Sequence, residues 1–104
     1  MRHDFGMRIE DIKKAVAPAC RAFDVKRLDA FGSATRGTST VSSDVDLLVE
    51  FRDPKIRPSG RFLGLLHQLE DSLGCEVDLL TLGSLRNPYF RERVLGERVS
   101  IYEG

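Results

Sequence analysis

Two stretches of the chain carry apolar residues at three- and four-residue steps, the spacing that places side chains on one face of a helix. The first runs from about residue 7 to residue 23 and contains Pro18, where a helix can kink because proline lacks an amide hydrogen. The second runs from Phe62 to Leu73 and is followed by Gly74, a residue type that commonly ends helices. The pattern therefore predicts two amphipathic helices.

Four short segments are instead rich in β-branched and other apolar residues and predict strands, at residues 25–31, 45–51, 76–81 and 98–102. A third, short helix is predicted from Asn87 and Pro88 to about Leu95, because asparagine caps helices and proline is favoured at their first position. The stretch 33–43 is rich in Gly, Ser and Thr and predicts a loop or one short helical turn, and the polar, proline-containing stretch 53–60 predicts a loop. This order of elements predicts an α/β domain of mixed α+β type, with a small mixed sheet flanked by helices.

Length and composition limit the class of protein. At 104 residues the chain is expected to form one domain over residues 1–104, and its hydrophobic content of 41% is ordinary for a folded globular chain. No apolar run approaches the ~18 residues that span a bilayer, and the N-terminus lacks the apolar stretch of a signal peptide, so we expect a cytoplasmic protein. The 16 basic and 16 acidic residues balance, which argues against nucleic acid as the main partner. Cys20 and Cys75 lack metal-binding spacing and are expected to be reduced packing residues.

Residues that are candidates for binding or catalysis lie at the ends of three predicted strands. Gly32 and Ser33 directly follow the first strand, where a glycine lets the backbone approach a bulky anion and a hydroxyl can donate to it. Asp44 and Asp46 are two residues apart in an extended segment, so both carboxylates lie on the same face. Asp78 repeats the setting of Asp46, because the tetrapeptide VDLL begins one residue before each of them. If these strands are neighbours in similar register, the three aspartates form one acidic cluster.

An acidic cluster of this kind is unfavourable unless a cation binds to it. Two like charges ~4 Å apart repel by about 1 kcal/mol in water and by about 4 kcal/mol at an effective dielectric constant of 20. A few carboxylate oxygens, completed by a phosphate-bearing substrate, suit Mg²⁺. A P-loop is the competing phosphate motif, but Thr38 stands where that motif requires lysine. Each feature alone is more often a turn, a strand end or an ion pair, and it is their combination that favours a metal-dependent phosphate site.

The segment FGSATRGTSTVSSDVDLLVEF resembles the signature of the DNA polymerase beta-like nucleotidyltransferases, in which Gly-Ser is followed after ten residues by Asp-x-Asp. The leucine-rich helix and the EVDLLT segment after it are similar to the minimal nucleotidyltransferase branch of that family. The resemblance runs from about Ile9 to Tyr102 and implies the polymerase beta-like nucleotidyltransferase fold. In many members an arginine lies one or two residues after the serine, whereas here Arg36 lies three residues after Ser33, which leaves a phosphate role for Arg36 open.

The resemblance also implies a reaction and a role for each site residue. Asp44 and Asp46 would bind one or two Mg²⁺ ions that bridge the phosphates of a nucleotide. Gly32 and Ser33 would hold the β- and γ-phosphates. Asp78 would be the third carboxylate, as a metal ligand and as the acceptor of a proton. A hydroxyl group would attack the α-phosphate, and pyrophosphate would leave.

Minimal members of this family are similar to antitoxins encoded beside HEPN-domain ribonuclease toxins, where AMP is transferred to a tyrosine of the toxin. We therefore expect a protein adenylyltransferase that uses ATP and acts on a HEPN-domain partner in a hetero-oligomer. Two alternatives stay open, namely an antitoxin that neutralises the toxin by binding alone, and a transferase that acts on RNA or on a small molecule. A group of arginines near the C-terminus is expected at the solvated surface, with partner or phosphate contact as the alternative. Its members are Arg86, Arg91, Arg93 and Arg98.

Overall fold

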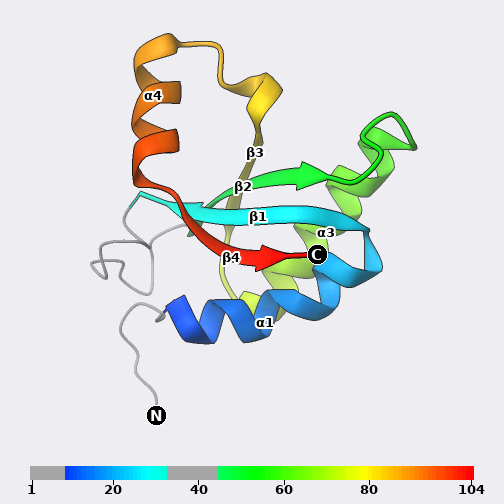
Figure 1. Ribbon diagram of the computed structural model, residues 1–104. Coiled ribbons are helices and arrows are strands. Elements are labelled where there is room, and N and C mark those ends of the chain that lie inside the picture. The colour runs from blue at the N-terminus through cyan, green and yellow to red at the C-terminus, as the bar shows by residue number, and fades with distance from the viewer. Residues whose placement is uncertain (1–8, 33–44) are drawn as a thin grey trace.

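The sheet at the centre of the fold has four strands in the spatial order β3-β2-β1-β4 (Figure 1). The computed structural model describes residues 9–32 and 45–104. The strands are β1 (Val25–Phe31), β2 (Val45–Phe51), β3 (Val77–Thr81) and β4 (Val99–Glu103). β1 pairs antiparallel with β2 and with β4, whereas β2 and β3 are parallel. The predicted mixed sheet is confirmed, and each strand begins and ends within one residue of its predicted bounds.

Helices cover both faces of this sheet. α1 (Ile9–Ala22) and α3 (Pro58–Leu73) pack on one face, and α4 (Pro88–Glu97) packs on the other (Figure 1). A single 3-10 turn, Leu82–Ser84, follows β3 and precedes α4. Within residues 9–32 and 45–104, no helix is long and apolar enough to cross a membrane.

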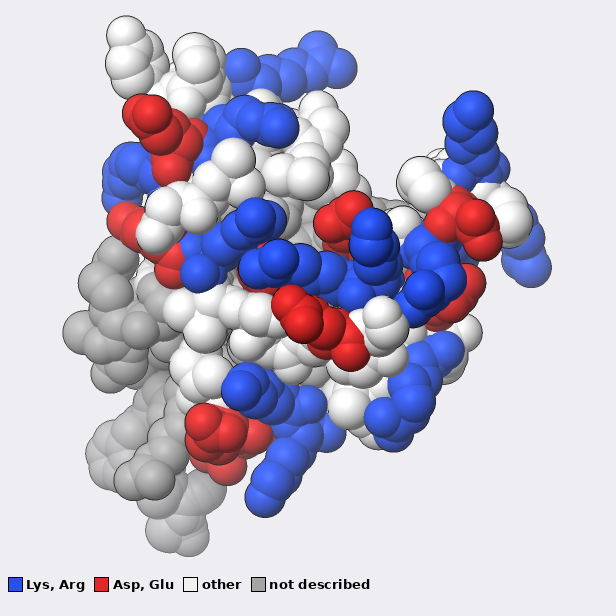
Figure 2. Space-filling model, viewed as in Figure 1, with Lys and Arg blue, Asp and Glu red and all other residues white. Residues whose placement is uncertain are grey.

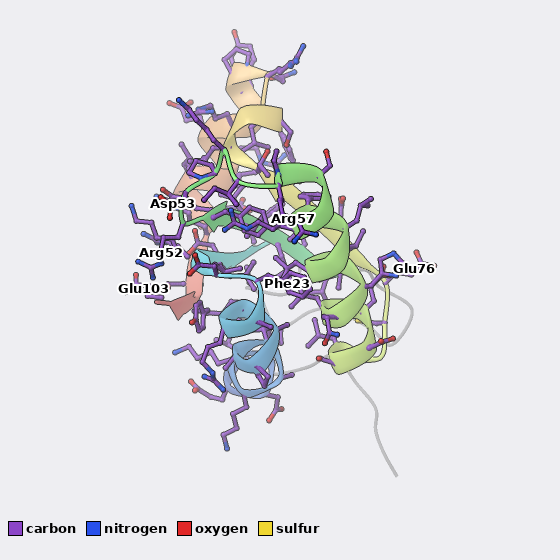
Figure 3. The ribbon with its side chains drawn as sticks, turned by 90° about the vertical axis from the view of Figure 1, so that its right-hand side faces the viewer. Phe23, Arg52, Asp53, Arg57, Glu76 and Glu103 are labelled. Atoms are coloured by element: carbon purple, nitrogen blue, oxygen red, sulfur yellow. The ribbon has the colours of Figure 1, made fainter. Side chains whose placement is uncertain are left out.

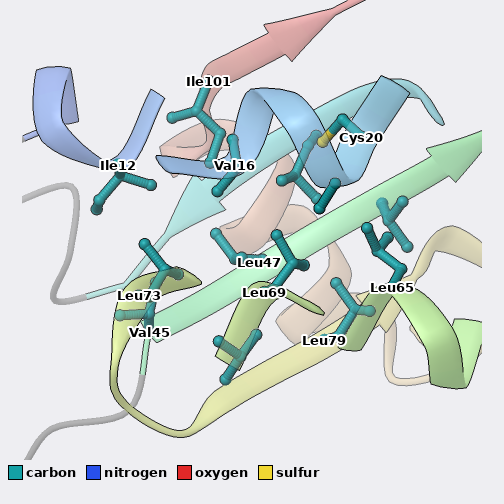
Figure 4. Packing of buried hydrophobic residues seen from close by; sticks show 14 of the residues in the cluster. Ile12, Val16, Cys20, Val45, Leu47, Leu65, Leu69, Leu73, Leu79 and Ile101 are labelled. Carbon is teal, nitrogen blue, oxygen red and sulfur yellow. The ribbon is translucent and has the colours of Figure 1, made fainter. Parts of the chain in front are cut away.

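The main core lies between the sheet and the pair α1 and α3 (Figure 4). Leu47 of β2 meets Leu65 and Leu69 of α3 there, and all three side chains are fully buried. Complete burial of a leucine side chain contributes about 1.5–3 kcal/mol relative to leaving it exposed. On the other face, Leu48 packs with Val94 of α4 in a smaller apolar cluster. β2 is therefore covered on both faces, which explains its nearly continuous apolar sequence.

α3 begins earlier than its apolar spacing predicts. Residues 58–60 form its first turn, so the prediction that they belong to a loop is wrong. Pro58 starts the helix because its fixed φ suits the first position, and Arg57 before it adopts a left-handed φ of 45°. The turn is exposed and has no apolar residue, so it adds nothing to the periodic pattern. At the other end Gly74, with φ 70°, donates its N–H to the carbonyl oxygen of Glu70, which confirms the predicted end of the helix.

Arg61 of α3 closes the end of the sheet that lies away from Gly32. Its guanidinium donates hydrogen bonds to the carbonyl oxygens of Arg52 at 2.6 Å and of Asp53 at 2.8 Å, and Figure 3 shows these two residues beside the start of α3. The same group lies over the ring of Phe51, 4.6 Å from the ring centroid. Arg61 thus holds the loop between β2 and α3, and its role is structural.

Neither Cys20 nor Cys75 is part of a disulfide. Cys20 is fully buried in α1, and burial raises the pKa of its thiol to about 12, an effect opposed by the charge of Arg21. Because the thiolate is the reactive form, Cys20 is a packing residue with little reactivity near neutral pH.

Candidate active site

Three of the residues singled out in the sequence lie side by side at one end of the sheet. Gly32 directly follows β1, Asp46 is the second residue of β2, and Asp78 is the second residue of β3. Phe31 pairs with Asp46, and Asp46 pairs with Asp78 across the parallel strands. Neighbouring strands are about 4.8 Å apart, so the two carboxylates come from adjacent positions. Phe31, Gly32, Asp46 and Asp78 line one pocket of about 410 Å³.

Strand alternation directs both aspartates to the face of the sheet that α4 covers. The residues that flank them are buried in the main core on the opposite face, and they are Val45, Leu47, Val77 and Leu79. Successive strand residues point to opposite faces, so Asp46 and Asp78 point away from that core. Asp46 is half-buried and Asp78 is exposed. The repeated tetrapeptide therefore places two carboxylates at the same level of two parallel strands.

Gly32 lies against the carboxylate of Asp46. Its φ is 70°, a left-handed conformation that favours glycine, and a Cβ atom at this position would lie 2.6 Å from Oδ2 of Asp46. Any larger residue would therefore displace the carboxylate or distort the end of β1. From the sequence, Gly32 was expected to let an anion approach the backbone closely. The structure adds a second reason for glycine at this position, because the carboxylate of Asp46 occupies the space where a Cβ atom would lie.

α4 forms the wall of the pocket that faces the two aspartates. Phe90, Arg93, Val94 and Glu97 line it, and these residues share one face of the helix. The ring of Phe90 meets that of Phe31 edge to face, with centroids 6.4 Å apart and an interplanar angle of 73°. Val94 is only 1% exposed. These two contacts set the rotation of the helix, so that Arg93 and Glu97 are presented to the pocket.

Apart from the open role of Arg93, this wall of the pocket was not predicted from the sequence. The spacing of the α4 residues is visible in the sequence, and it could have identified them as one helix face. Nothing in the pattern says which face of the sheet a ten-residue helix covers, because α4 has only one buried residue, Val94. The contact of Phe90 with Phe31 decides it, and that contact joins residues far apart in the chain.

Polar contacts hold the start of α4 in place. Oδ1 of Asn87 accepts hydrogen bonds from the amides of Tyr89 at 2.9 Å and of Phe90 at 3.2 Å, which confirms the predicted cap. Arg91 donates to the carbonyl oxygen of Leu82 at 3.0 Å, and so ties the helix to the 3-10 turn that follows β3. The pocket wall is therefore attached directly to the segment that follows the strand of Asp78.

A buried ion pair that the sequence analysis did not foresee holds the end of α4. Asp29 of β1 is 1% exposed and is the only buried charged residue in the described part of the chain. Its Oδ2 accepts a hydrogen bond from Arg98, the residue that caps α4, at 3.4 Å. Its Oδ1 accepts one from Nε of Arg27 at 2.8 Å, and this bond raises the pKa of Arg27 above its ordinary value. Asp29 thus links the central strand to the helix that faces the site.

The site residues within the described ranges suit a divalent cation by their chemistry. Carboxylate oxygens are the ligands that Mg²⁺ prefers, and Asp46 and Asp78 supply them from adjacent strands. Among residues 9–32 and 45–104, no three or more side chains of His, Cys, Asp or Glu are grouped as a metal site. Asp44, the expected further ligand, lies outside these ranges, as do Ser33 and Arg36.

On the face shown in Figure 2, basic and acidic side chains are interspersed over the sheet and the helices. This mixture agrees with the formal net charge of zero. A broad basic surface of the kind that binds nucleic acid is not seen on that face.

The chain is similar in sequence to a known protein family. Residues 12–101 match the family described as nucleotidyltransferase domain. A protein of Methanocaldococcus jannaschii, assigned as a protein adenylyltransferase, is 38% identical to this chain over 95 residues. The aligned region covers 91% of this chain and 99% of that relative.

Two solved structures are similar in fold. One, assigned as a minimal nucleotidyltransferase, has a TM-score of 0.74 and 34% identity, and the match covers 89% of this chain and 95% of the other. The second belongs to a complex between the tri-AMPylated HEPN toxin of Shewanella oneidensis and an MNT antitoxin. It has a TM-score of 0.64 and 17% identity, covers 92% of this chain and 73% of the other, and shows a likeness of fold alone.

Proposed function

This chain belongs to the nucleotidyltransferase domain family, and from that premise we propose that it transfers AMP from ATP to a hydroxyl group of a partner protein in a Mg²⁺-dependent reaction. The observation that carries the proposal is the parallel register that sets Asp46 level with Asp78, beside Gly32. The acceptor that we propose is a tyrosine of a HEPN-domain toxin, bound to this chain in the cytoplasm as a hetero-oligomer. Support for this acceptor comes from the likeness in fold to a complex that contains an AMPylated HEPN toxin.

In this proposal the acceptor oxygen attacks the α-phosphorus of ATP, the bond from that phosphorus to the bridging oxygen breaks, and pyrophosphate leaves. Asp78 is exposed at the pocket, so a hydroxyl group of another protein can approach it, and its carboxylate accepts the hydroxyl proton. Asp46, in contact range of Gly32, and Asp44 are the residues that would hold Mg²⁺. The bound ion would supply positive charge that offsets the charge of the phosphates and of the leaving group. The backbone at Gly32 and the hydroxyl of Ser33 hold the β- and γ-phosphates.

The proposed function is tested by following the phosphate that is transferred. We expect this chain, incubated with MgCl₂ and ATP labelled at the α-phosphate, to label a purified HEPN-domain protein encoded beside it. ATP labelled at the γ-phosphate should leave the partner unlabelled, because that phosphate departs in pyrophosphate. Chelation of the metal by EDTA should abolish the labelling, and replacement of the modified tyrosine by phenylalanine should remove the acceptor.

Other results would contradict this function in distinguishable ways. A partner that is inactivated without ever being labelled would identify the chain as an antitoxin that acts by binding alone. Label in RNA or in a small molecule, with none in the partner, would show that the proposed acceptor class is wrong. Label from both α- and γ-labelled ATP would indicate transfer of a larger part of the nucleotide.

Replacement of Gly32 by alanine is expected to lower the rate of AMP transfer by about 10- to 100-fold, because small displacements of a catalytic group have effects of this size. The added Cβ, 2.6 Å from Oδ2 of Asp46, must shift that carboxylate. The left-handed φ of 70° costs an additional ~1–2 kcal/mol of folding free energy. The measurements are the initial rate of transfer and the melting temperature.

Gly74→Ala is the matched control for this variant. Gly74 has the same φ of 70°, but apart from its own neighbours along the chain no heavy atom of the described residues lies within 4 Å of the position that its Cβ would take. It should therefore lose a similar stability and keep the transfer rate. Equal transfer rates in Gly32→Ala and Gly74→Ala would show that the contact with Asp46 has no part in the reaction.

A further inference from the structure

We propose that Arg93 of α4 binds the phosphate chain of the nucleotide from the side of the pocket opposite the two aspartates. This proposal rests on the proposed function, since it adds a residue to the same site. Arg93 lines the pocket together with Asp46 and Asp78. Of the pocket-lining residues within the described ranges, it is the only one that carries a positive charge.

Arg93 differs from the arginines near it in the sequence, which form structural contacts. Arg91 donates to a backbone carbonyl oxygen of the turn before α4, and Arg98 pairs with the buried Asp29. Arg93 has a different environment, since its side chain is 71% exposed and its ion pair with Glu97 is 3.9 Å long. An exposed pair of this type contributes about 0.3–0.5 kcal/mol, so it leaves the guanidinium able to bind a stronger anion.

The charge of the expected ligand favours a positive side chain on this wall of the pocket. ATP carries about four negative charges near neutral pH, and the carboxylates of Asp46 and Asp78 face the same space. A positive group on the facing wall lowers the electrostatic cost of bringing the phosphates to these carboxylates. Arginine suits the task because its planar guanidinium presents donors that match two phosphate oxygens at once.

α4 also presents Arg93 from a fixed position. Phe90, one turn earlier, contacts the ring of Phe31, and the adjacent Val94 is 1% exposed. Arg93 lies between these two anchors on the pocket side of the helix, so its Cα cannot move far without breaking apolar contacts. A binding side chain on an anchored helix loses less conformational freedom when the ligand binds than a side chain on a loop does, and this favours binding of the phosphates.

The test measures binding apart from transfer. The probe is an ATP analogue whose α,β-bridging oxygen is replaced by methylene, titrated with Mg²⁺ into the whole chain by calorimetry. Arg93→Gln should raise the dissociation constant by about 10- to 100-fold, the loss expected for charge-assisted hydrogen bonds. Arg93→Lys should have a smaller effect. Arg86→Gln is the matched control, because Arg86 is exposed and outside the pocket, and it should bind within about twofold of the wild type.

Each other outcome has a defined meaning. An unchanged melting temperature is expected for Arg93→Gln, since the side chain is mostly exposed. Equal affinity of Arg93→Gln and wild type for the analogue would overturn the proposal, and loss of HEPN binding in the same variant would make Arg93 a partner contact instead. A wild-type chain that does not bind the analogue would also overturn it. Analogue binding that depends on Arg93, without transfer to the HEPN protein, would overturn only the proposed acceptor.

Discussion

Asp46→Asn is expected to reduce the rate of AMP transfer by about three orders of magnitude, because the substitution removes a half-buried carboxylate that we propose as a metal ligand. The fold should be kept, because asparagine has nearly the same size and shape as aspartate and can still form hydrogen bonds. Asp46 and Asp78 lie in register on adjacent parallel strands, so removing one charge also lowers the repulsion between them when no cation is bound. The melting temperature without metal should therefore change little. The measurements are the transfer rate and the melting temperature with and without MgCl₂.

The metal dependence of stability separates a lost ligand from a disturbed fold. A cation that binds only the folded state raises the melting temperature, so MgCl₂ should stabilise the wild type and have a much smaller effect on Asp46→Asn. Glu50→Gln is the control, because Glu50 lies four residues further along β2, where it is exposed and paired with Lys26. Full transfer activity in Asp46→Asn would refute the assignment of this residue, and a loss as large in Glu50→Gln would show that the charge of β2 in general is responsible.

Asp29→Ala is expected to destabilise the folded chain by about 2–3 kcal/mol. Removing one partner of a buried ion pair commonly costs about 3–5 kcal/mol of folding free energy. A smaller loss is expected here because water can reach the two arginines. Arg27 and Arg98 have side chains that are 33% and 27% exposed, whereas that of Asp29 is 2% exposed. Chemical denaturation monitored by circular dichroism gives the free energy of unfolding directly.

Two further variants make this result specific. Asp29→Asn keeps an oxygen that can accept one hydrogen bond, so its loss should be smaller than that of Asp29→Ala. Glu50→Ala removes an exposed pair, the 3.6 Å contact with Lys26, and should cost at most about 1 kcal/mol. A loss in Asp29→Ala no greater than in Glu50→Ala would show that the buried pair does not hold α4 against the sheet.

Local sequence was sufficient to predict most of the elements. Asn87 followed by a proline determines the start of α4 through hydrogen bonds to nearby amides, and Gly74 ends α3 through its own backbone conformation. The VDLL repeat predicts two equivalent strands, which the structure pairs in register, Asp46 with Asp78. The start of α3 was not predicted in this way, because its exposed first turn, residues 58–60, adds nothing to the apolar periodicity that identified the helix.

The candidate site likewise has one part that local sequence predicts and one part that depends on tertiary contacts. The sequence was enough to identify Gly32, Asp46 and Asp78 as candidates at strand ends, because strand alternation and a repeated tetrapeptide are local properties of the chain. The parallel pairing of β2 with β3, which sets Asp46 level with Asp78, came from the tertiary structure. Only the tertiary structure decided what faces them. Arg93 reaches the pocket because α4 packs on that face of the sheet, and the buried Asp29 gains, besides the nearby Arg27, a second partner in Arg98, which is 69 residues away in the sequence. Such contacts depend on packing between distant segments, which no periodicity along the chain encodes.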